Sequence, residues 1–189
     1  MKTNHRRLSG LIVAAGLCWL ARIAASQTWQ ATTAPAQDWI SVACSSNATK
    51  LVATAYSGKI FTSADYGATW TPGDSIRNWQ AVASSADGVK LLAAVYGGQI
   101  YTSTNSGIDW KPHESNRNWA AMASSADGVR LVAGANNGQI YTSDDSGVTW
   151  LPRDNNRLWN GLASSADGSR LVSVAGDGFI YVSTNFGTN

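Results

Sequence analysis

The sequence predicts an all-β fold, a β-propeller of four four-stranded blades, and three observations lead to this prediction. First, a tryptophan recurs every 40 residues, at Trp39, Trp79, Trp119 and Trp159, and a similar amino-acid sequence follows it each time. Second, each interval contains four short apolar runs separated by Gly, Asp and Asn turn residues. Third, no stretch of the repeated part is long enough for a periodic helix. A tandem repeat of this length and strand number is typical of propeller blades.

The first 26 residues are predicted to be a signal peptide. A basic start, Lys2 to Arg7, precedes the apolar run "LSGLIVAAGLCWLA", and small residues precede Gln27. The apolar run is short for a membrane span and is followed by Arg22, so we expect cleavage before Gln27. The protein would then be secreted or periplasmic, and it would contact a membrane only if this segment stayed uncleaved.

The chain that remains after cleavage is mildly acidic and has one thiol. Removing the leader takes away four basic residues and leaves 10 basic against 12 acidic residues, a formal charge of −2. A nucleic-acid surface needs clustered positive charge, so no nucleic-acid partner is expected. Cys44 and His113 would be the sole Cys and His, which excludes an internal disulfide, a catalytic triad and a His/Cys metal cluster. We expect no metal and no cofactor.

The repeats follow one another without gaps, and we number them repeat 1 (39–78), repeat 2 (79–118), repeat 3 (119–158) and repeat 4 (159–189). Repeat 4 stops before its fourth strand. Residues 27–38, ahead of repeat 1, contain "TW" followed by a proline, which is the fourth-strand pattern of the other repeats. We therefore predict that 27–38 is a closing strand for repeat 4 and that 27–189 form one domain.

Closure can occur in two ways. The strand can complete its own ring and give a monomer, which we favour because residues 27–189 contain all sixteen strands, or it can be exchanged with a neighbour and give a homodimer. A third alternative is that the sequence is a fragment of a longer repeat array.

A second motif lies between the third and fourth strands of each repeat. It reads "SADYGATW", "STNSGIDW" and "SDDSGVTW", with "STNFGTN" in repeat 4. These stretches resemble the Asp-box, or BNR, repeat of sialidases, sortilin-type receptors and a propeller-type photosystem II assembly factor, and the resemblance covers 27–189. It implies a structural turn in which the acid or amide binds backbone groups and the glycine takes positive φ. The residues given this role are Asp65, Gly67, Trp70, Asn105, Gly107, Trp110, Asp145, Gly147, Trp150, Asn185 and Gly187.

The alternating direction of the strands divides the turns between two faces. The turns between first and second strands and the Asp boxes share one face, which we call the repeated face because its sequence hardly changes. The turns between second and third strands and the connections between repeats share the other, the variable face. We expect a binding site on the variable face. Its candidate residues are Tyr56, Arg77, Tyr96, Arg117, Asn136, Arg157 and Asp177.

The three arginines have two interpretations. A ring of guanidinium groups near the channel mouth can select a carboxylate, sulfate or phosphate. Alternatively, arginine is a consensus residue of the repeat that stacks on the adjacent tryptophan or pairs with an acid three residues earlier. Those acids are Asp74, Glu114 and Asp154.

The sequence therefore predicts an exported binding or assembly module without catalytic residues. It would recognise a glycan, a peptide or a partner subunit through the variable face. The alternative is a glycoside hydrolase of the sialidase type, a family that uses an arginine triad. That site would also need a Tyr nucleophile paired with a Glu and an acid/base Asp. Glu114 is the sole Glu, and the arginines stand at equivalent repeat positions, so we expect no enzyme.

Overall fold

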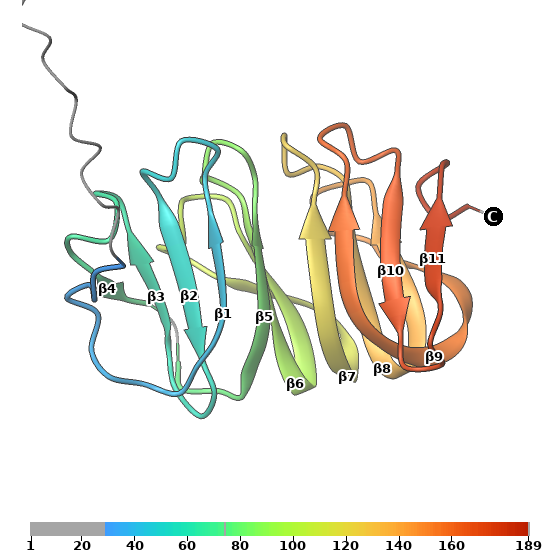
Figure 1. Cartoon of the computed structure of the whole chain (residues 1–189), viewed down its shortest axis with the longest axis horizontal. Coiled ribbons are helices and arrows are strands. Elements are labelled where there is room, and N and C mark those ends of the chain that lie inside the picture. The colour runs from blue at the N-terminus through green and yellow to red at the C-terminus, as the bar shows by residue number, and fades with distance from the viewer. Residues whose placement is uncertain (1–28, 74, 189) are drawn as a thin grey trace, which may run out of the picture. The chain divides into compact units, whose positions relative to one another are not determined.

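The computed structural model describes residues 29–73 and 75–188 (Figure 1). The chain divides into two units, 1–31 and 32–189, and the described part of the first, 29–31, has no regular secondary structure. The predicted signal peptide lies outside the described residues. In the part of the chain that is described, no helix is long and apolar enough to cross a membrane.

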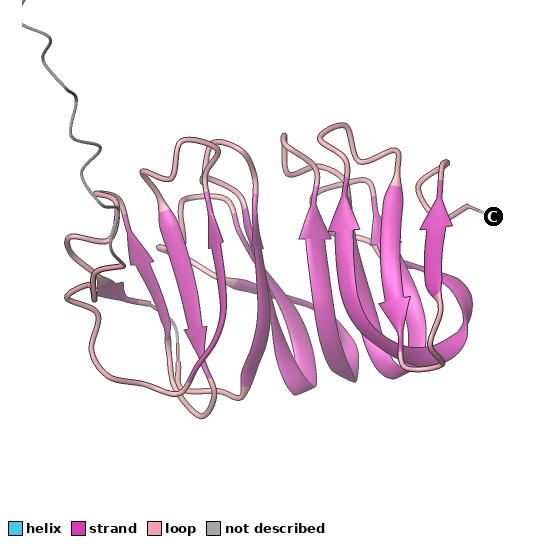
Figure 2. Ribbon diagram, viewed as in Figure 1, coloured by secondary structure: helices cyan, strands magenta, loops and turns pink. Residues whose placement is uncertain are grey.

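The described residues form strands, turns and loops without a helix (Figure 2). Repeat 1 forms a four-stranded sheet of order β1-β2-β3-β4, and repeats 2 to 4 form a seven-stranded sheet of order β11-β10-β9-β8-β7-β6-β5. The neighbouring strands whose register is known are antiparallel. The strands are β1 (Trp39–Cys44), β2 (Leu51–Ala55), β3 (Ile60–Ser63), β4 (Thr71–Pro72), β5 (Trp79–Ser84), β6 (Leu91–Ser103), β7 (Lys111–Ser124), β8 (Leu131–Ser143), β9 (Leu151–Ser164), β10 (Leu171–Ala175) and β11 (Ile180–Ser183).

Several strands that the sequence predicts as separate are joined in the structure. β6 contains the second and third strands of repeat 2, and β7 contains its fourth strand together with the first strand of repeat 3. They join because the turn on the variable face pairs with the connection that follows. Tyr96 lies opposite Asn118 and Gly98 opposite Arg117, with irregular register on either side of the glycine. The ladder therefore runs through the turn instead of stopping at it.

The described part of the predicted closing strand, residues 29–38, forms no strand. Thr33 Oγ1 donates a hydrogen bond of 2.6 Å to the Ala68 carbonyl in repeat 1. Among the described strands, β11 pairs with β10 alone. Closure of repeat 4 by this segment is thus absent from the structure, and the closed ring stays a prediction.

In repeats 2 to 4, the tryptophan that begins the repeat packs in the core. Trp79, Trp119 and Trp159 are fully buried. Their rings meet those of Tyr101, Tyr141 and Tyr181 edge to face, with centroids 5.2 to 5.3 Å apart. Such a pair contributes about 1 kcal/mol beyond the burial of its area. The 40-residue tryptophan spacing therefore marks a core position in repeats 2 to 4.

Consecutive repeats contact each other in the same way three times, and we call this contact the repeat junction. Val52 of repeat 1 and Val82 of repeat 2 share one buried cluster. Backbone hydrogen bonds link equivalent turns along the row, from the N–H of one turn to the carbonyl of the next. They join Ser46 to Ala86 (2.7 Å), Ala86 to Ala126 (2.8 Å) and Ala126 to Ala166 (2.7 Å). The junction is therefore a repeated interface with both an apolar and a hydrogen-bonded part.

Candidate functional site

The Asp-box stretches are hydrogen-bonded turns on the repeated face. Ser63 Oγ donates to Asp65 Oδ1 (2.7 Å) and accepts from the Gly67 N–H (2.9 Å). The Thr69 N–H donates to the same carboxylate (2.9 Å), and Trp70 Nε1 donates to the Gly67 carbonyl (3.1 Å). Gly67 has a φ of 85°, which a residue with a side chain seldom adopts.

The same bonds recur in the other repeats, with Asn in place of Asp where the sequence has it. Asn105 Oδ1 accepts from Ser103 Oγ (3.0 Å) and from the Asp109 N–H (2.9 Å). Asp145 accepts from Ser143 Oγ and the Thr149 N–H, and Asn185 accepts from Ser183 Oγ. These acids and amides bind their own turn, which agrees with the structural role that the sequence resemblance implies.

Hydrogen bonds to the carboxylates lower their pKa values. The Thr69 hydroxyl and N–H, together with Ser63, lower the pKa of Asp65 to about 2. Serine hydroxyls lower the pKa of Asp87, Asp127 and Asp167 in the turns between first and second strands. The charged form of each carboxylate is therefore part of the folded turn.

On the variable face the arginines lie against aromatic rings. The guanidinium carbon of Arg117 is 4.5 Å from the centroid of Tyr141 and 5.9 Å from that of Trp119. Its Nη2 is 3.0 Å from Glu114 Oε1. Arg77 makes the equivalent ring contacts, at 4.7 Å from Tyr101. These contacts match the repeat-consensus interpretation of the arginines. Asp74, the acid predicted beside Arg77, is not among the described residues.

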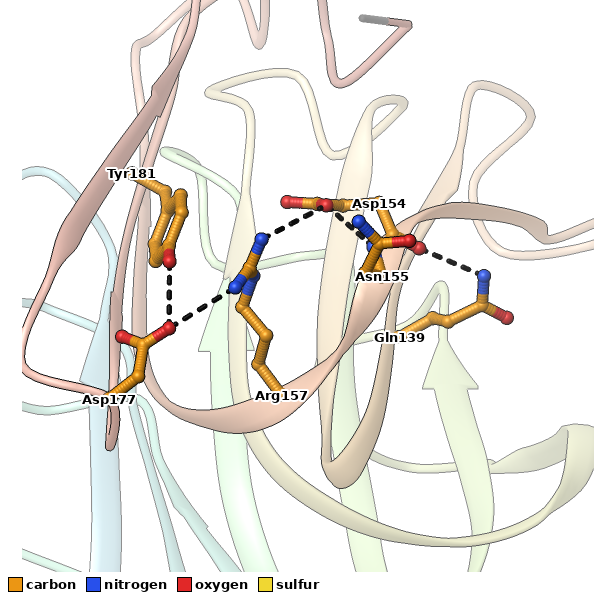
Figure 3. A network of polar contacts seen from close by, with 6 residues as sticks. All are labelled: Gln139, Asp154, Asn155, Arg157, Asp177 and Tyr181. Atoms are coloured by element: carbon orange, nitrogen blue, oxygen red, sulfur yellow. Dashed lines mark hydrogen bonds and ion pairs between the residues drawn. The ribbon is translucent and has the colours of Figure 1, made fainter.

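Arg157 belongs to a network of polar contacts on this face (Figure 3). Its Nη1 is 3.2 Å from Asp177 Oδ2 and its Nη2 is 3.8 Å from Asp154 Oδ1. The Tyr181 hydroxyl donates to the same Asp177 oxygen (2.7 Å), and this bond is the main cause of the lowered pKa of Asp177. The guanidinium is thus held between two carboxylates and the Tyr181 ring, 4.4 Å away.

The structure spreads the other predicted binding residues over separate repeats. Tyr56 and Tyr96 are exposed at equivalent turns of repeats 1 and 2, and Asn136 is half-buried in the corresponding turn of repeat 3. Of the seven candidates, Arg157 and Asp177 are joined by an ion pair. The predicted set is therefore a row of equivalent positions along one face.

A hollow of about 500 Å³ lies between repeats 1 and 2 on the variable face. Its lining residues include Ser57, Ile76, Arg77, Gln99 and Asn116. Sequence reasoning named Arg77 but missed Ile76, whose side chain is exposed. The signal was available, because isoleucine stands where the next two repeats have asparagine, at Asn116 and Asn156.

Phe179, in repeat 4, is a second exposed apolar residue that the sequence reasoning missed. It stands where the other repeats have Lys59, Gln99 and Gln139. Departure from the repeat consensus towards an exposed apolar side chain therefore identifies both missed residues.

The remaining titratable residues make no metal site in the described part of the chain. No group of three or more His, Cys, Asp or Glu side chains gathers there. His113 Nε2 lies 2.8 Å from Thr102 Oγ1, and partial burial lowers its pKa. Cys44 is a free, exposed thiol.

Comparison with known proteins gives structural matches but no sequence family. No protein-family model matches the sequence, and no curated protein matches it. A GH74 enzyme from Niastella koreensis is 22% identical, with a TM-score of 0.69 over 84% of this chain and 24% of that chain. YCF48 from Cyanidioschyzon merolae is 18% identical, with a TM-score of 0.61 over 78% of this chain and 50% of that one.

The β-propeller domain of Cps50 (Swd1) from Myceliophteria thermophila is 14% identical, with a TM-score of 0.61 over 80% of this chain and 53% of that domain. A further YCF48 structure, at a TM-score of 0.59, is bound to a D1 peptide. The chain thus spans about half of YCF48 and of the Swd1 domain, and about a quarter of the GH74 enzyme. At these identities the likeness shows the fold alone, and the chain is an all-β protein with the β-propeller fold.

Proposed function

We propose that the chain is an exported, non-catalytic binding propeller whose variable face docks a segment of a partner protein. The observation that carries the proposal is the hollow between repeats 1 and 2, with the exposed Ile76 in its lining and Tyr56 and Tyr96 beside lining residues in the sequence. Exposed aromatic and aliphatic side chains around a hollow are typical of protein interaction sites.

The polar groups of the hollow suit an extended peptide. Ser57 Oγ donates to Asn78 Oδ1 (3.0 Å), and Gln99 Nε2 donates to the Glu114 carbonyl (3.1 Å). These amides and hydroxyls can also bind the backbone of a docked segment, while Ile76 contacts an apolar side chain. YCF48 with its D1 peptide is a precedent for peptide binding by this fold.

The arginines contribute charge and position rather than a dedicated anion site. Arg117 and Arg157 are each neutralised by a carboxylate within the same face. An incoming acidic group would have to compete with Glu114 or Asp177. We therefore propose that these residues orient the aromatic rings beside them, and that selection for a strongly anionic ligand is secondary.

Photo-crosslinking in the source organism tests the proposed face. Placing a photoreactive phenylalanine at Tyr96 should crosslink one discrete partner protein, and Ile76→Asp in the same chain should abolish that product. The matched control places the photoreactive residue at Val148, which is also exposed but lies on the repeated face. Equal crosslinking from both positions, or from Val148 alone, would show that the binding face is a different one.

A glycan partner and a hydrolase are distinguished by two further measurements. Binding to a glycan array that is lost with Tyr96→Ala, without any crosslinked protein, would replace the peptide with a sugar. Turnover of a fluorogenic sialoside that disappears with Arg117→Ala would overturn the non-catalytic proposal in favour of the sialidase-type alternative.

A further inference from the structure

The last repeat exposes side chains whose equivalents in repeat 1 are buried. Val52, in the second strand of repeat 1, is 1% exposed, and its equivalent in repeat 4, Val172, is 38% exposed. Ile60, in the third strand of repeat 1, is fully buried, whereas the equivalent Ile180 is 70% exposed. In repeats 1 to 3 these positions face the following repeat across the repeat junction. The outer face of repeat 4 is therefore one half of a junction without its other half.

The first repeat exposes the opposite half. Val42 is 69% exposed, whereas its equivalents Val82 and Met122 are 7% and 8% exposed because each packs against the preceding repeat. Both ends of the row are thus apolar sheet faces. The exposed face of repeat 1 corresponds to the face that later repeats pack against the preceding repeat. The exposed face of repeat 4 corresponds to the face that earlier repeats pack against the following repeat.

The hydrogen-bond ladder of the repeated face ends in a complementary way. Each turn donates an N–H to the carbonyl of the next turn, from Ser46 through Ala86 and Ala126. At one end the Ala166 N–H has no hydrogen-bond partner within 29–73 and 75–188. At the other end no turn of the described chain donates to the Ser46 carbonyl. A free donor therefore stands at the end of repeat 4 and a free acceptor at the start of repeat 1.

We propose that these two ends bind a second copy of the chain, head to tail, so that two chains form one ring of eight repeats. Repeat 4 of each chain would pack on repeat 1 of the other and reproduce the junction already formed three times within the chain. Each chain offers one end of each kind, so two chains make two identical junctions and leave no face uncovered.

The exposure of both ends favours a second copy over closure within one chain. In a four-repeat ring, repeat 4 would cover Val42, yet both ends are exposed in the structure. Four repeats span about half of the Swd1 propeller domain. A second copy would therefore bring the row to roughly the size of that propeller domain.

Among the described strands repeat 4 has no fourth one, and the same arrangement would supply it. In the interior, the fourth strand of one repeat leads directly into the first strand of the next, as in β7 and β9. The residues of the second copy that precede its Trp39 would arrive at repeat 4 by the same path. Residues 32–38 would have to leave the Ala68 carbonyl, where Thr33 now donates.

The proposed junction differs from the interior ones at one turn. Gly128 and Gly168 have positive φ, and a Cβ at either would lie 2.8 or 2.6 Å from the stem of Lys90 or Arg130 in the preceding repeat. Repeat 1 has Ala48 at this position, also with positive φ. In the ring Ala48 would face Arg170 of the second copy, so this junction is looser than the interior three, and Ala48→Gly should tighten it several-fold.

Sedimentation equilibrium of the chain as secreted, over a wide range of concentrations, tests the ring. We expect the mass of two chains. Val42→Asp and Val172→Asp should each give single chains, because each variant spoils both junctions of its own dimer. An equimolar mixture should associate again, since one junction then joins two unaltered ends. Val148→Asp, at an exposed position away from both ends, should stay a dimer.

The mass distribution also has outcomes that overturn the proposal. A single-chain mass at every concentration would indicate closure within one chain or no closure. Masses that grow beyond two chains would indicate an open fibre. Failure of the mixture to associate would exclude head-to-tail pairing. None of these results bears on the crosslinking test of the variable face, so the two proposals can fail separately.

Cys44 supplies an independent probe of the end of repeat 1. It is exposed and lies on the same side of β1 as Val42, whereas its equivalents Ser84, Ser124 and Ser164 are half-buried. Alkylation of Cys44, followed by mass spectrometry of its peptide, should be several-fold slower at high than at low protein concentration. In Val42→Asp the rate should not depend on concentration, and the same independence in the unaltered chain would overturn the proposal.

Discussion

At the scale of single residues, the repeated face is stabilised by short polar side chains that satisfy their own turns. A serine hydroxyl accepts a glycine N–H in the Asp box of each repeat, and in repeats 1 to 3 the acid or amide also accepts the backbone N–H four residues further on. Since Asn105 and Asp145 make the same backbone bonds, the oxygen acceptor matters more than the charge. This explains why the sequence alternates between the two residues without changing the turn.

The Asp145 turn gives the first prediction. Asp145→Ala removes the acceptor for Ser143 Oγ and for the Thr149 N–H and hydroxyl, and should lower the free energy of unfolding by about 1 to 2 kcal/mol. Asp145→Asn should keep most of the stability, as Asn105 does in repeat 2. Urea unfolding checks both, with the exposed neighbour Asp144→Ala as the control. Equal losses in the Asn and Ala variants would show that the charge is what stabilises the turn.

The carboxylates of the turns also determine the response to acid. Their pKa values are lowered in the folded chain, to about 2 for Asp65, against about 3.9 in the unfolded chain. Their stabilising effect is therefore complete above about pH 5 and is lost as the pH falls through about 4 towards 2. The urea concentration at the midpoint of unfolding should decrease as the pH falls through this range. It should decrease less steeply in Asp65→Asn. A midpoint that already drops between pH 7 and 6 would contradict the assignment to these groups.

At the scale of strands and turns, the repeat junction depends on glycines that lie close to the neighbouring repeat. A Cβ at Gly147 would lie 2.6 Å from Thr102 Cγ2 in the repeat before it. The positive φ of the turn and the close packing thus require glycine for two separate reasons. Gly178, on the variable face, has the same φ of 90° but nothing within 4 Å of the added atom.

This pair of glycines separates backbone strain from packing. Gly178→Ala should cost about 1 kcal/mol for the positive φ alone. Gly147→Ala should cost about 1 to 3 kcal/mol more, because the added methyl group overpacks the junction. Thermal unfolding measures both, and Thr102→Ser should recover part of the loss in Gly147→Ala. If Gly147→Ala and Gly178→Ala unfold at the same temperature, the junction does not contact Gly147 closely.

At the scale of the whole molecule, the chain is a row of repeats whose interior junctions are alike and whose ends are open. The same tryptophan is fully buried in repeats 2 to 4, and Trp39 in repeat 1 is 38% exposed because no other repeat of the described chain packs against that side of it. Burial here is therefore a property of position in the row. Stability should come from the sum of repeats and junctions, as in other repeat proteins.

Export is a prediction at the same scale. The chain produced in an exporting host should have the mass of residues 27–189 and should begin at Gln27, because the signal peptide is removed there. Intact-mass measurement of the secreted material decides it. The full mass of 1–189 in the membrane fraction would show instead that the N-terminal segment is retained as an anchor.

The sequence by itself determined the all-β class, the four repeats and the turn chemistry. These follow from local rules that the 40-residue period repeats, so each feature is seen several times. For the candidate site, the sequence predicted Tyr56, Tyr96 and the arginines, but their equivalence hid that Arg77 is the one of them that lines the hollow. Ile76 and Phe179 were missed because apolar residues in polar loops have no local signature apart from their departure from the consensus.

Only the tertiary structure decided where strands merge, what the arginines contact and where the row ends. Whether a ring closes depends on the angle between neighbouring repeats, which is set by the packing at each junction and leaves no trace in the period. The same repeat sequence is compatible with rings of different size. Both ends of this row are exposed in the structure, so what covers them is a question of assembly, which the local rules of the sequence do not contain.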